Sequence, residues 1–205
     1  MSGFADTFAP QRVRRSLARL GAEPQKRFDR IPGLDQAGLT RAAVLIPLTE
    51  IEGQMVALFT KRPDSMPTHS GEISFPGGRF EASDRDLRET ALREAQEEIA
   101  LAREDVRLYG ALLQMPTVTG FEVTTFVGEF DQPYELQPDA REIEMLFMAP
   151  LAALADPEIH RVESRKWQGL SFDLHFYDYQ GHVIWGATGY MLHMLLQLVG
   201  GDVSS

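Results

Sequence analysis

The hydrophobic pattern predicts helices in four parts of the chain. The predicted helices span residues 10–20, 84–99, 150–155 and 187–199. In the first, Val13 and Leu17 fall on one face, because residues four apart lie on the same side of an α-helix. We expect the second helix to begin near Ser83 or Asp84, with Asp86 able to complete its cap. The last helix is strongly apolar, which is typical of a helix buried in a core.

Apolar runs of strand length lie between these helices. The predicted strands span residues 42–49, 55–60, 72–75, 106–114, 123–130, 143–148, 171–177 and 182–185. Hairpin turns are expected at Glu52-Gly53 and at Gln180-Gly181. Residues 63–78 are rich in proline and glycine and predict a long loop around one short strand. The sum predicts an α+β fold, with helices packed on a curved or split sheet.

Composition places the chain among single-domain globular proteins. Of its 205 residues, 43% are hydrophobic and 24% are charged, and no run of 18 apolar residues predicts a membrane span. The absence of cysteine excludes disulfides and thiolate chemistry and is consistent with a cytoplasmic location. A net charge of −10 argues against nucleic-acid binding. We expect an N-terminal helix and loop at residues 1–39, the main domain at 40–200 and a tail at 201–205.

One predicted helix carries three glutamates along one edge. At about 100° per residue, Glu98 lies about 40° from Glu94, and Glu97 about 60° from it on the other side. Like charges this close repel, and a divalent cation would resolve the conflict, with Mg²⁺ or Mn²⁺ favoured by oxygen ligands. Arg93 can pair with one of the carboxylates and orient it. A solvated acidic helix face is the alternative interpretation.

A glycine pair precedes this helix. Gly77 and Gly78 follow a short predicted strand, and glycine allows the backbone to approach a ligand closely. A backbone carbonyl there could join the carboxylates around a metal ion. The alternative interpretation is an ordinary turn.

The segment from Gly77 to Leu101 resembles the signature of the Nudix hydrolase family. That signature runs from a glycine, through an acidic residue, to the pattern Arg-Glu-x-x-Glu-Glu-x-Gly. Residues 93–99 read Arg-Glu-Ala-Gln-Glu-Glu-Ile and match its core, and Asp84 holds the acidic position. The resemblance covers roughly residues 40 to 198. It implies the Nudix fold, a mixed curved or split sheet sandwiched between helices with a loop–helix–loop catalytic motif.

Further details are similar to the coenzyme A pyrophosphatase branch of this family. One extra residue separates Gly78 from Arg93, compared with the general signature. The other similar segments are residues 58–62 (Leu-Phe-Thr-Lys-Arg), His69, Gly71, residues 75–78 (Phe-Pro-Gly-Gly), residues 119–123 (Thr-Gly-Phe-Glu-Val) and residues 184–188 (Ile-Trp-Gly-Ala-Thr). This resemblance implies hydrolysis of coenzyme A, or an acyl-coenzyme A, to 3′,5′-ADP and 4′-phosphopantetheine or its acyl form.

The resemblance also implies roles for individual residues. Metal ligands would be Glu94, Glu97, Glu98 and the backbone of Gly78, and the catalytic residues would be Arg93, Glu97 and Glu98. Substrate contacts would come from Arg62, His69, Gly77 and Gly78. Glu142 and Glu144 are weaker candidates for an additional base, since exposed acids are the norm.

The chain departs from the branch pattern at three positions. Pro63 and Pro67 stand where the branch has a Ser or Ala and a second arginine, so one candidate phosphate contact is missing. Ala100 replaces the glycine that ends the signature, and alanine in a left-handed helix terminus is strained by roughly 1 kcal/mol. Because all three carboxylates are present, we expect altered specificity or stability rather than inactivity.

Several alternatives stay open at this point. The same machinery could hydrolyse ADP-ribose or a dinucleotide, or the chain could be a non-catalytic Nudix-like module that binds a nucleotide. In each case the expected partner is a small nucleoside diphosphate derivative, without nucleic acid or membrane. The C-terminal helix is interpreted first as core and second as a homodimer face.

Overall fold

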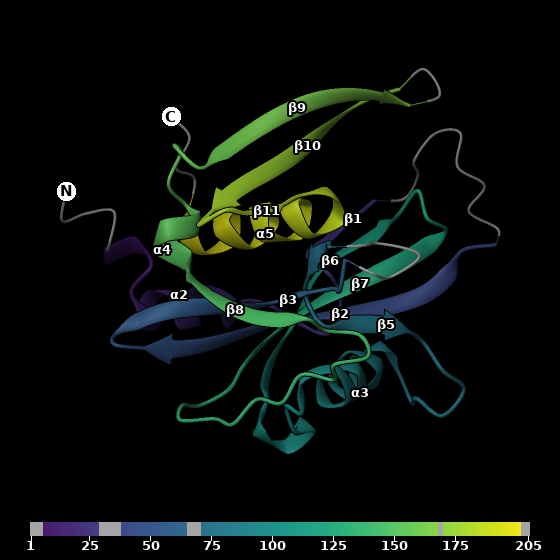
Figure 1. The fold of residues 1–205 in the computed structure, drawn as a ribbon, viewed down its shortest axis with the longest axis horizontal. Coiled ribbons are helices and arrows are strands. Elements are labelled where there is room, and N and C mark those ends of the chain that lie inside the picture. The colour runs from purple at the N-terminus through teal and green to yellow at the C-terminus, as the bar shows by residue number, and fades with distance from the viewer. Residues whose placement is uncertain (1–5, 29–37, 65–70, 168–169, 202–205) are drawn as a thin grey trace.

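The computed structural model describes residues 6–28, 38–64, 71–167 and 170–201 (Figure 1). Its helices are α2 (Pro10–Leu17), α3 (Leu87–Ile99), α4 (Leu151–Leu154) and α5 (Gly186–Gly200), with a 3-10 turn η1 (Arg103–Asp105). Its strands are β1 (Lys26–Arg27), β2 (Thr40–Ile51), β3 (Gln54–Lys61), β4 (Ile73–Ser74), β5 (Gly77–Arg79), β6 (Arg107–Pro116), β7 (Phe121–Glu129), β8 (Met145–Pro150), β9 (His160–Trp167), β10 (Leu170–Tyr179) and β11 (His182–Ile184).

The main sheet is mixed and splits along one edge of its central strand. Strands run in the order β1-β6-β7-β2-β3-β4, with β8 also paired to β3. β2 is parallel to β7 on one side. On its other side, β2 pairs with β5 over residues 42–44 and with β3 over residues 48–51. The gap between these two pairings separates β5 from β3, and the expected split sheet is confirmed.

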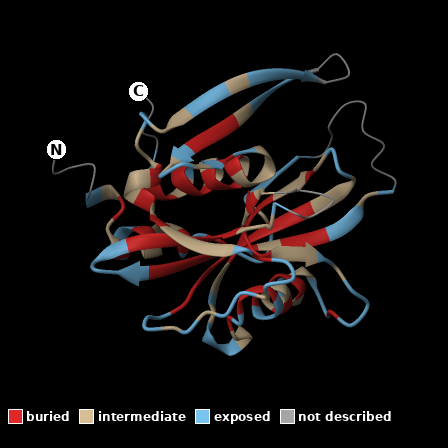
Figure 2. Ribbon diagram, viewed as in Figure 1, coloured by how far each residue is buried: buried red, intermediate tan, exposed pale blue. Residues whose placement is uncertain are grey.

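Helices cover both faces of this sheet. Alternate side chains of β2 point to opposite faces, so each face carries apolar side chains that a helix can bury. Ala43 and Leu45 join a core beneath α3, whereas Ile46 and Leu48 join the core beneath α2 and α5. Figure 2 shows buried residues concentrated between these layers. None of the described helices is long and apolar enough to cross a membrane.

A second, three-stranded sheet covers the C-terminal helix. β10 lies between β9 and β11, and α5 packs against β10 on one side and against β6 and α2 on the other (Figure 1). Met191 and Leu195 of α5 are buried, and Met194 and Leu198 are partly buried. The expectation that this helix belongs to the core is confirmed.

The structure corrects several predicted boundaries. α3 begins at Leu87 rather than near Ser83 or Asp84, because the Asp86 carboxylate accepts the first free backbone N–H groups and caps the helix there. β8 begins two residues later than the strand predicted from residue 143. Strand β9 was missed, because its polar sequence lacks the apolar run expected of a strand. Gly77 and Gly78 belong to strand β5 rather than to a loop.

Candidate functional site

The three glutamates of α3 lie where this helix crosses the short strand β5. α3 contacts both β2 and β5. The helix face toward the sheet carries Ala91 and Ala95, both fully buried, and such small side chains allow the helix to approach the backbone of β5. A Cβ atom added at Gly78 would lie 2.3 Å from Oε1 of Glu94, so only glycine leaves room for this carboxylate.

Glu98 is the most buried of the three carboxylates. It is 7% exposed, and its Oε2 accepts a hydrogen bond from the backbone N–H of Gly77 at 3.3 Å. Burial raises the pKa of Glu98 to about 8, and the negative charges of Glu94 and Glu142 act in the same direction. Arg62 acts in the opposite direction, which places its positive charge near the site. Glu98 is therefore poorly stabilised as an anion by the protein alone.

The side chains of the other two glutamates are progressively more exposed to solvent. The Glu94 side chain is 16% exposed, and burial raises its pKa above the ordinary value despite the adjacent Arg93. The Glu97 side chain is 60% exposed. The edge of α3 thus presents one buried, one half-buried and one exposed carboxylate, which leaves one face of the cluster open to a ligand.

Arg93 connects this cluster to the loop before the helix. Its Nε and Nη2 donate to the two carboxylate oxygens of Asp84 at 2.9 and 3.0 Å. Its Nη1 donates to Glu94 at 2.9 Å and to Glu97 at 3.1 Å, and Nη2 also donates to the Arg79 carbonyl. The Arg93 side chain is only 9% exposed, and these hydrogen bonds hold it against the carboxylates of Asp84, Glu94 and Glu97.

Asp84 is a site residue whose contact with Arg93 the sequence did not predict. Arg93 holds the pKa of Asp84 well below its usual range, so this carboxylate stays charged. Thr90 Oγ1 donates to it at 2.8 Å, and the backbone N–H of Glu81 donates at 3.0 Å. The match of Asp84 to the acidic position of the signature was the available signal, but its partner nine residues away was not readable from spacing.

The segment before β8 packs against the C-terminal end of α3, next to Glu98. The backbone N–H of Gln137 donates to the Ile99 carbonyl at 3.1 Å, and that of Asp139 donates to the Glu98 carbonyl at 2.9 Å. These bonds satisfy carbonyls at the helix end and bring Glu142 into electrostatic contact with Glu98. Glu142 pairs with Arg62 at 3.5 Å.

The structure brings most of the predicted residues together. Arg93, Glu94, Glu97, Glu98, Gly77 and Gly78 form one contiguous cluster, and Arg62 lies beside it. Glu144 pairs instead with Lys61 at 3.3 Å. His69 and Pro67 lie outside the described residues. Ala100 adopts the expected left-handed conformation, with φ at 56°.

The donor set suits a hard divalent cation. Three carboxylates share one edge of α3, and the buried one, Glu98, accepts a 3.3 Å hydrogen bond from the backbone N–H of Gly77. A cation would balance the repulsion that Glu94 and Glu142 impose on Glu98. Oxygen donors of this kind favour Mg²⁺, Mn²⁺ or Ca²⁺ over softer metals.

Comparison with known proteins gives consistent matches. The model of the NUDIX domain matches residues 39–169. The chain is 33% identical over 159 residues to "Uncharacterized Nudix hydrolase NudL" of Photorhabdus laumondii, covering 77% of this chain and 84% of that one. It is 36% identical over 161 residues to the protein of the same name from Pectobacterium atrosepticum, covering 76% and 80%. A solved Nudix hydrolase from M. smegmatis, RenU, is 21% identical and aligns over 58% of this chain and 75% of its own with a TM-score of 0.49.

Proposed function

This chain belongs to the Nudix hydrolase family, and from that premise we propose that it cleaves the diphosphate linkage of coenzyme A or an acyl-coenzyme A. Water adds across the phosphoanhydride, giving 3′,5′-ADP and 4′-phosphopantetheine or its acyl form. The observation that carries the hydrolytic part of the proposal is the graded carboxylate cluster Glu94, Glu97 and Glu98 on one edge of α3.

The proposed cofactor is Mg²⁺ or Mn²⁺. Glu94, Glu97 and Glu98 would hold it, together with the backbone of Gly78. When bound, such an ion neutralises phosphoryl oxygens and lowers the pKa of a bound water. The fit rests on the buried Glu98 carboxylate, whose pKa is raised to about 8 by burial and by neighbouring acids in the protein alone.

The protein's own residues divide the remaining work. Arg93 holds Glu94 and Glu97 in place through its paired N–H groups, and Asp84 holds Arg93. Glu97 is the most exposed of the three carboxylates, so in this proposal it accepts the proton of the attacking water. In this proposal Arg62 binds a phosphate oxygen of the substrate, and this contact replaces its 3.5 Å ion pair with Glu142.

The coenzyme A part of the proposal rests on three segments that resemble the coenzyme A branch in sequence. Residues 58–61 end β3, where Thr60 and Lys61 pair with β4, and Arg62 follows directly. Residues 119–123 enter β7, where Phe121 lies 5.2 Å from the guanidinium of Arg79 in the glycine strand β5. Residues 184–188 leave β11, which contacts β4. Each of the three segments thus adjoins β4 or β5, the two short strands on either side of Pro76, and this supports a shared substrate site.

A substrate panel tests the proposal. Purified protein is incubated with coenzyme A, ADP-ribose and NADH, with Mg²⁺ or Mn²⁺ and then with chelator, and the products are identified by mass spectrometry. We expect 3′,5′-ADP and 4′-phosphopantetheine from coenzyme A only when metal is present. Preferential cleavage of ADP-ribose or NADH would replace the coenzyme A assignment while keeping the hydrolase chemistry.

Two matched variants separate catalysis from folding. Glu98→Gln removes a charge at the site and should reduce turnover by orders of magnitude. Glu104→Gln makes the same change on exposed η1 and should have no effect. Near-normal turnover of Glu98→Gln would refute the assignment of Glu98 to the catalytic site. If the native protein binds a nucleotide but does not hydrolyse it, the chain is a binding module instead. A homodimer and a cytoplasmic location remain further predictions.

A further inference from the structure

Three histidines gather between the small sheet and the C-terminal helix. His160 lies on β9, His175 on β10 and His193 on α5, elements that lie together in Figure 1. Nε2 of His160 lies 3.0 Å from Nδ1 of His175, and the rings of His175 and His193 stack with centroids 3.8 Å apart. One ring nitrogen from each histidine lies within 4.8 Å of the other two.

These separations are close to those of a metal site. With zinc–nitrogen bonds of about 2.0–2.1 Å and tetrahedral angles, two ligand nitrogens lie about 3.4 Å apart. The His160–His175 pair is already closer than this at 3.0 Å. The widest pair, at no more than 4.8 Å, would need to close by at most about 1.4 Å. The three rings lie within 22° of parallel, and an imidazole lone pair lies in the plane of its ring. The partly buried His193 ring must therefore rotate out of its stack on His175 to direct a nitrogen at a shared ion.

The geometry points to a second metal site, in which His160, His175 and His193 bind a borderline transition-metal ion, Zn²⁺ or its substitute Co²⁺. Imidazole nitrogen selects such ions, whereas the carboxylates of α3 select hard cations. The two sites also lie on opposite faces of the main sheet, because α3 covers one face and α5 the other. This inference does not depend on the proposed hydrolysis.

The surroundings of the three rings disfavour their charged form. Burial lowers the pKa of each, and it lowers that of His193 to about 4 with help from the other two histidines. A neutral imidazole still carries one N–H, and the 3.0 Å contact between His160 and His175 is a hydrogen bond in which one of the two nitrogens donates. Metal binding would replace this hydrogen bond, because each ligating nitrogen must offer a lone pair. Two charges lie nearby: Asp173 acts on His175 and favours a cation, whereas Lys26 acts on His193 and opposes one.

A bound ion would tie the small sheet to the body of the molecule. Its ligands come from two strands of the small sheet and from α5, so it would cross-link β9 and β10 to the helix that packs on the main sheet. Three protein ligands leave the fourth zinc position for water or another donor. The buried Tyr177 hydroxyl, 3.4 Å from Nδ1 of His193, is the neighbouring oxygen.

Cobalt absorption of the full chain tests this site directly. The protein is prepared without a polyhistidine tag, stripped with chelator, and titrated with Co²⁺ in both the native and the Glu98→Gln forms. Four-coordinate Co²⁺ with nitrogen ligands absorbs visible light far more strongly than six-coordinate Co²⁺ with oxygen ligands. We expect one strongly absorbing Co²⁺ per chain in both forms, displaced by Zn²⁺, and a higher melting temperature with Zn²⁺.

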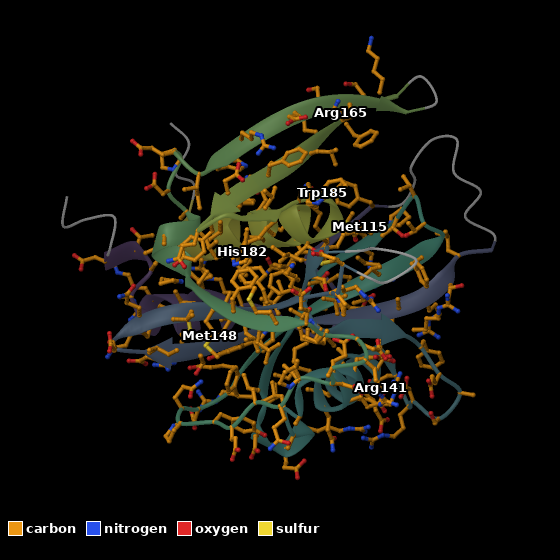
Figure 3. All side chains as sticks on the ribbon, in the orientation of Figure 1. Met115, Arg141, Met148, Arg165, His182 and Trp185 are labelled. Atoms are coloured by element: carbon orange, nitrogen blue, oxygen red, sulfur yellow. The ribbon has the colours of Figure 1, made fainter. Side chains whose placement is uncertain are left out.

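Two histidine variants locate the ion. His160→Gln should weaken Zn²⁺ binding at least about 10-fold, since even changes to groups supporting a metal ligand cost that much. His182→Gln is the matched control, because this ring stacks on Phe147 outside the cluster; Figure 3 labels it on the α5 side of the main sheet. If the native protein shows only the weak absorption of six-coordinate Co²⁺ with oxygen ligands, the proposal is overturned. The three histidines would then be stacked rings that serve only to pack the core. That outcome would not affect the hydrolase assignment, because the carboxylates of α3 are unchanged.

Discussion

Gly78→Ala tests whether the glycine at position 78 of β5 is needed to leave room for the Glu94 carboxylate. The added Cβ would lie 2.3 Å from Oε1 and 2.5 Å from Cδ of Glu94, whereas ordinary contacts begin near 3.4 Å. The carboxylate must therefore move by about 1 Å. A misplacement of that size in a catalytic arrangement can reduce turnover by about 100-fold, which equals about 2.7 kcal/mol in the activation barrier.

The same substitution should have little effect on folding. Gly78 lies in strand β5 and has no positive φ, so alanine fits its backbone. The atoms it displaces are the flexible end of a partly exposed side chain. We expect the free energy of unfolding of the metal-free protein to change by less than about 1 kcal/mol.

The assay combines three measurements on Gly78→Ala and on a control. Turnover of coenzyme A with Mg²⁺, the Mn²⁺ dissociation constant by electron paramagnetic resonance, and urea unfolding are compared with the native protein. Gly21→Ala is the control, because a Cβ there meets no atom within 4 Å. Native turnover together with native Mn²⁺ affinity in Gly78→Ala would refute the view that Gly78 seats Glu94.

Three further predictions concern stability. Ala100→Gly should raise the free energy of unfolding by about 0.5–1 kcal/mol, because it relieves the left-handed strain at φ 56° against a smaller entropic loss; unchanged urea stability would argue against strain. Asp84→Asn should cost about 3 kcal/mol in thermal unfolding, because it removes the charged partner of the buried Arg93; a melting temperature equal to the native one would contradict this. In the metal-free protein, the folded-state pKa of Glu98 is about 8 and its ordinary value is 4.5, so the folded state binds the extra proton and unfolding becomes easier as pH rises between these values. Glu98→Gln and added Mg²⁺ should both flatten that profile, and a flat native profile without metal would show that Glu98 is not perturbed.

Local geometry explains why the centre of the candidate site was predictable. An α-helix places residues three and four apart on one edge wherever it folds, so the shared edge of Glu94, Glu97 and Glu98 follows from their spacing alone. The turns at Glu52-Gly53 and Gln180-Gly181 were predictable from local turn chemistry, because a two-residue hairpin turn favours glycine where φ is positive. All four residues do have positive φ.

The start of α3 shows where local reasoning fails. Both Asp84 and Asp86 are good capping residues, and sequence alone does not choose between them. In the folded chain Arg93 engages Asp84, which leaves Asp86 to cap the helix. The choice depends on a contact formed only after the loop packs against the helix.

The sequence by itself determined the carboxylate edge, the glycine pair before it, the α+β class and the family, because these depend on local spacing and on a contiguous motif. Only the tertiary structure decided the burial of Glu98, the capture of Arg93 by Asp84, the split of the sheet beside β2 and the meeting of His160, His175 and His193. Each of these brings together groups from different elements, and their distances are set by how strands pair and helices pack. No periodicity in a single stretch of chain encodes such distances.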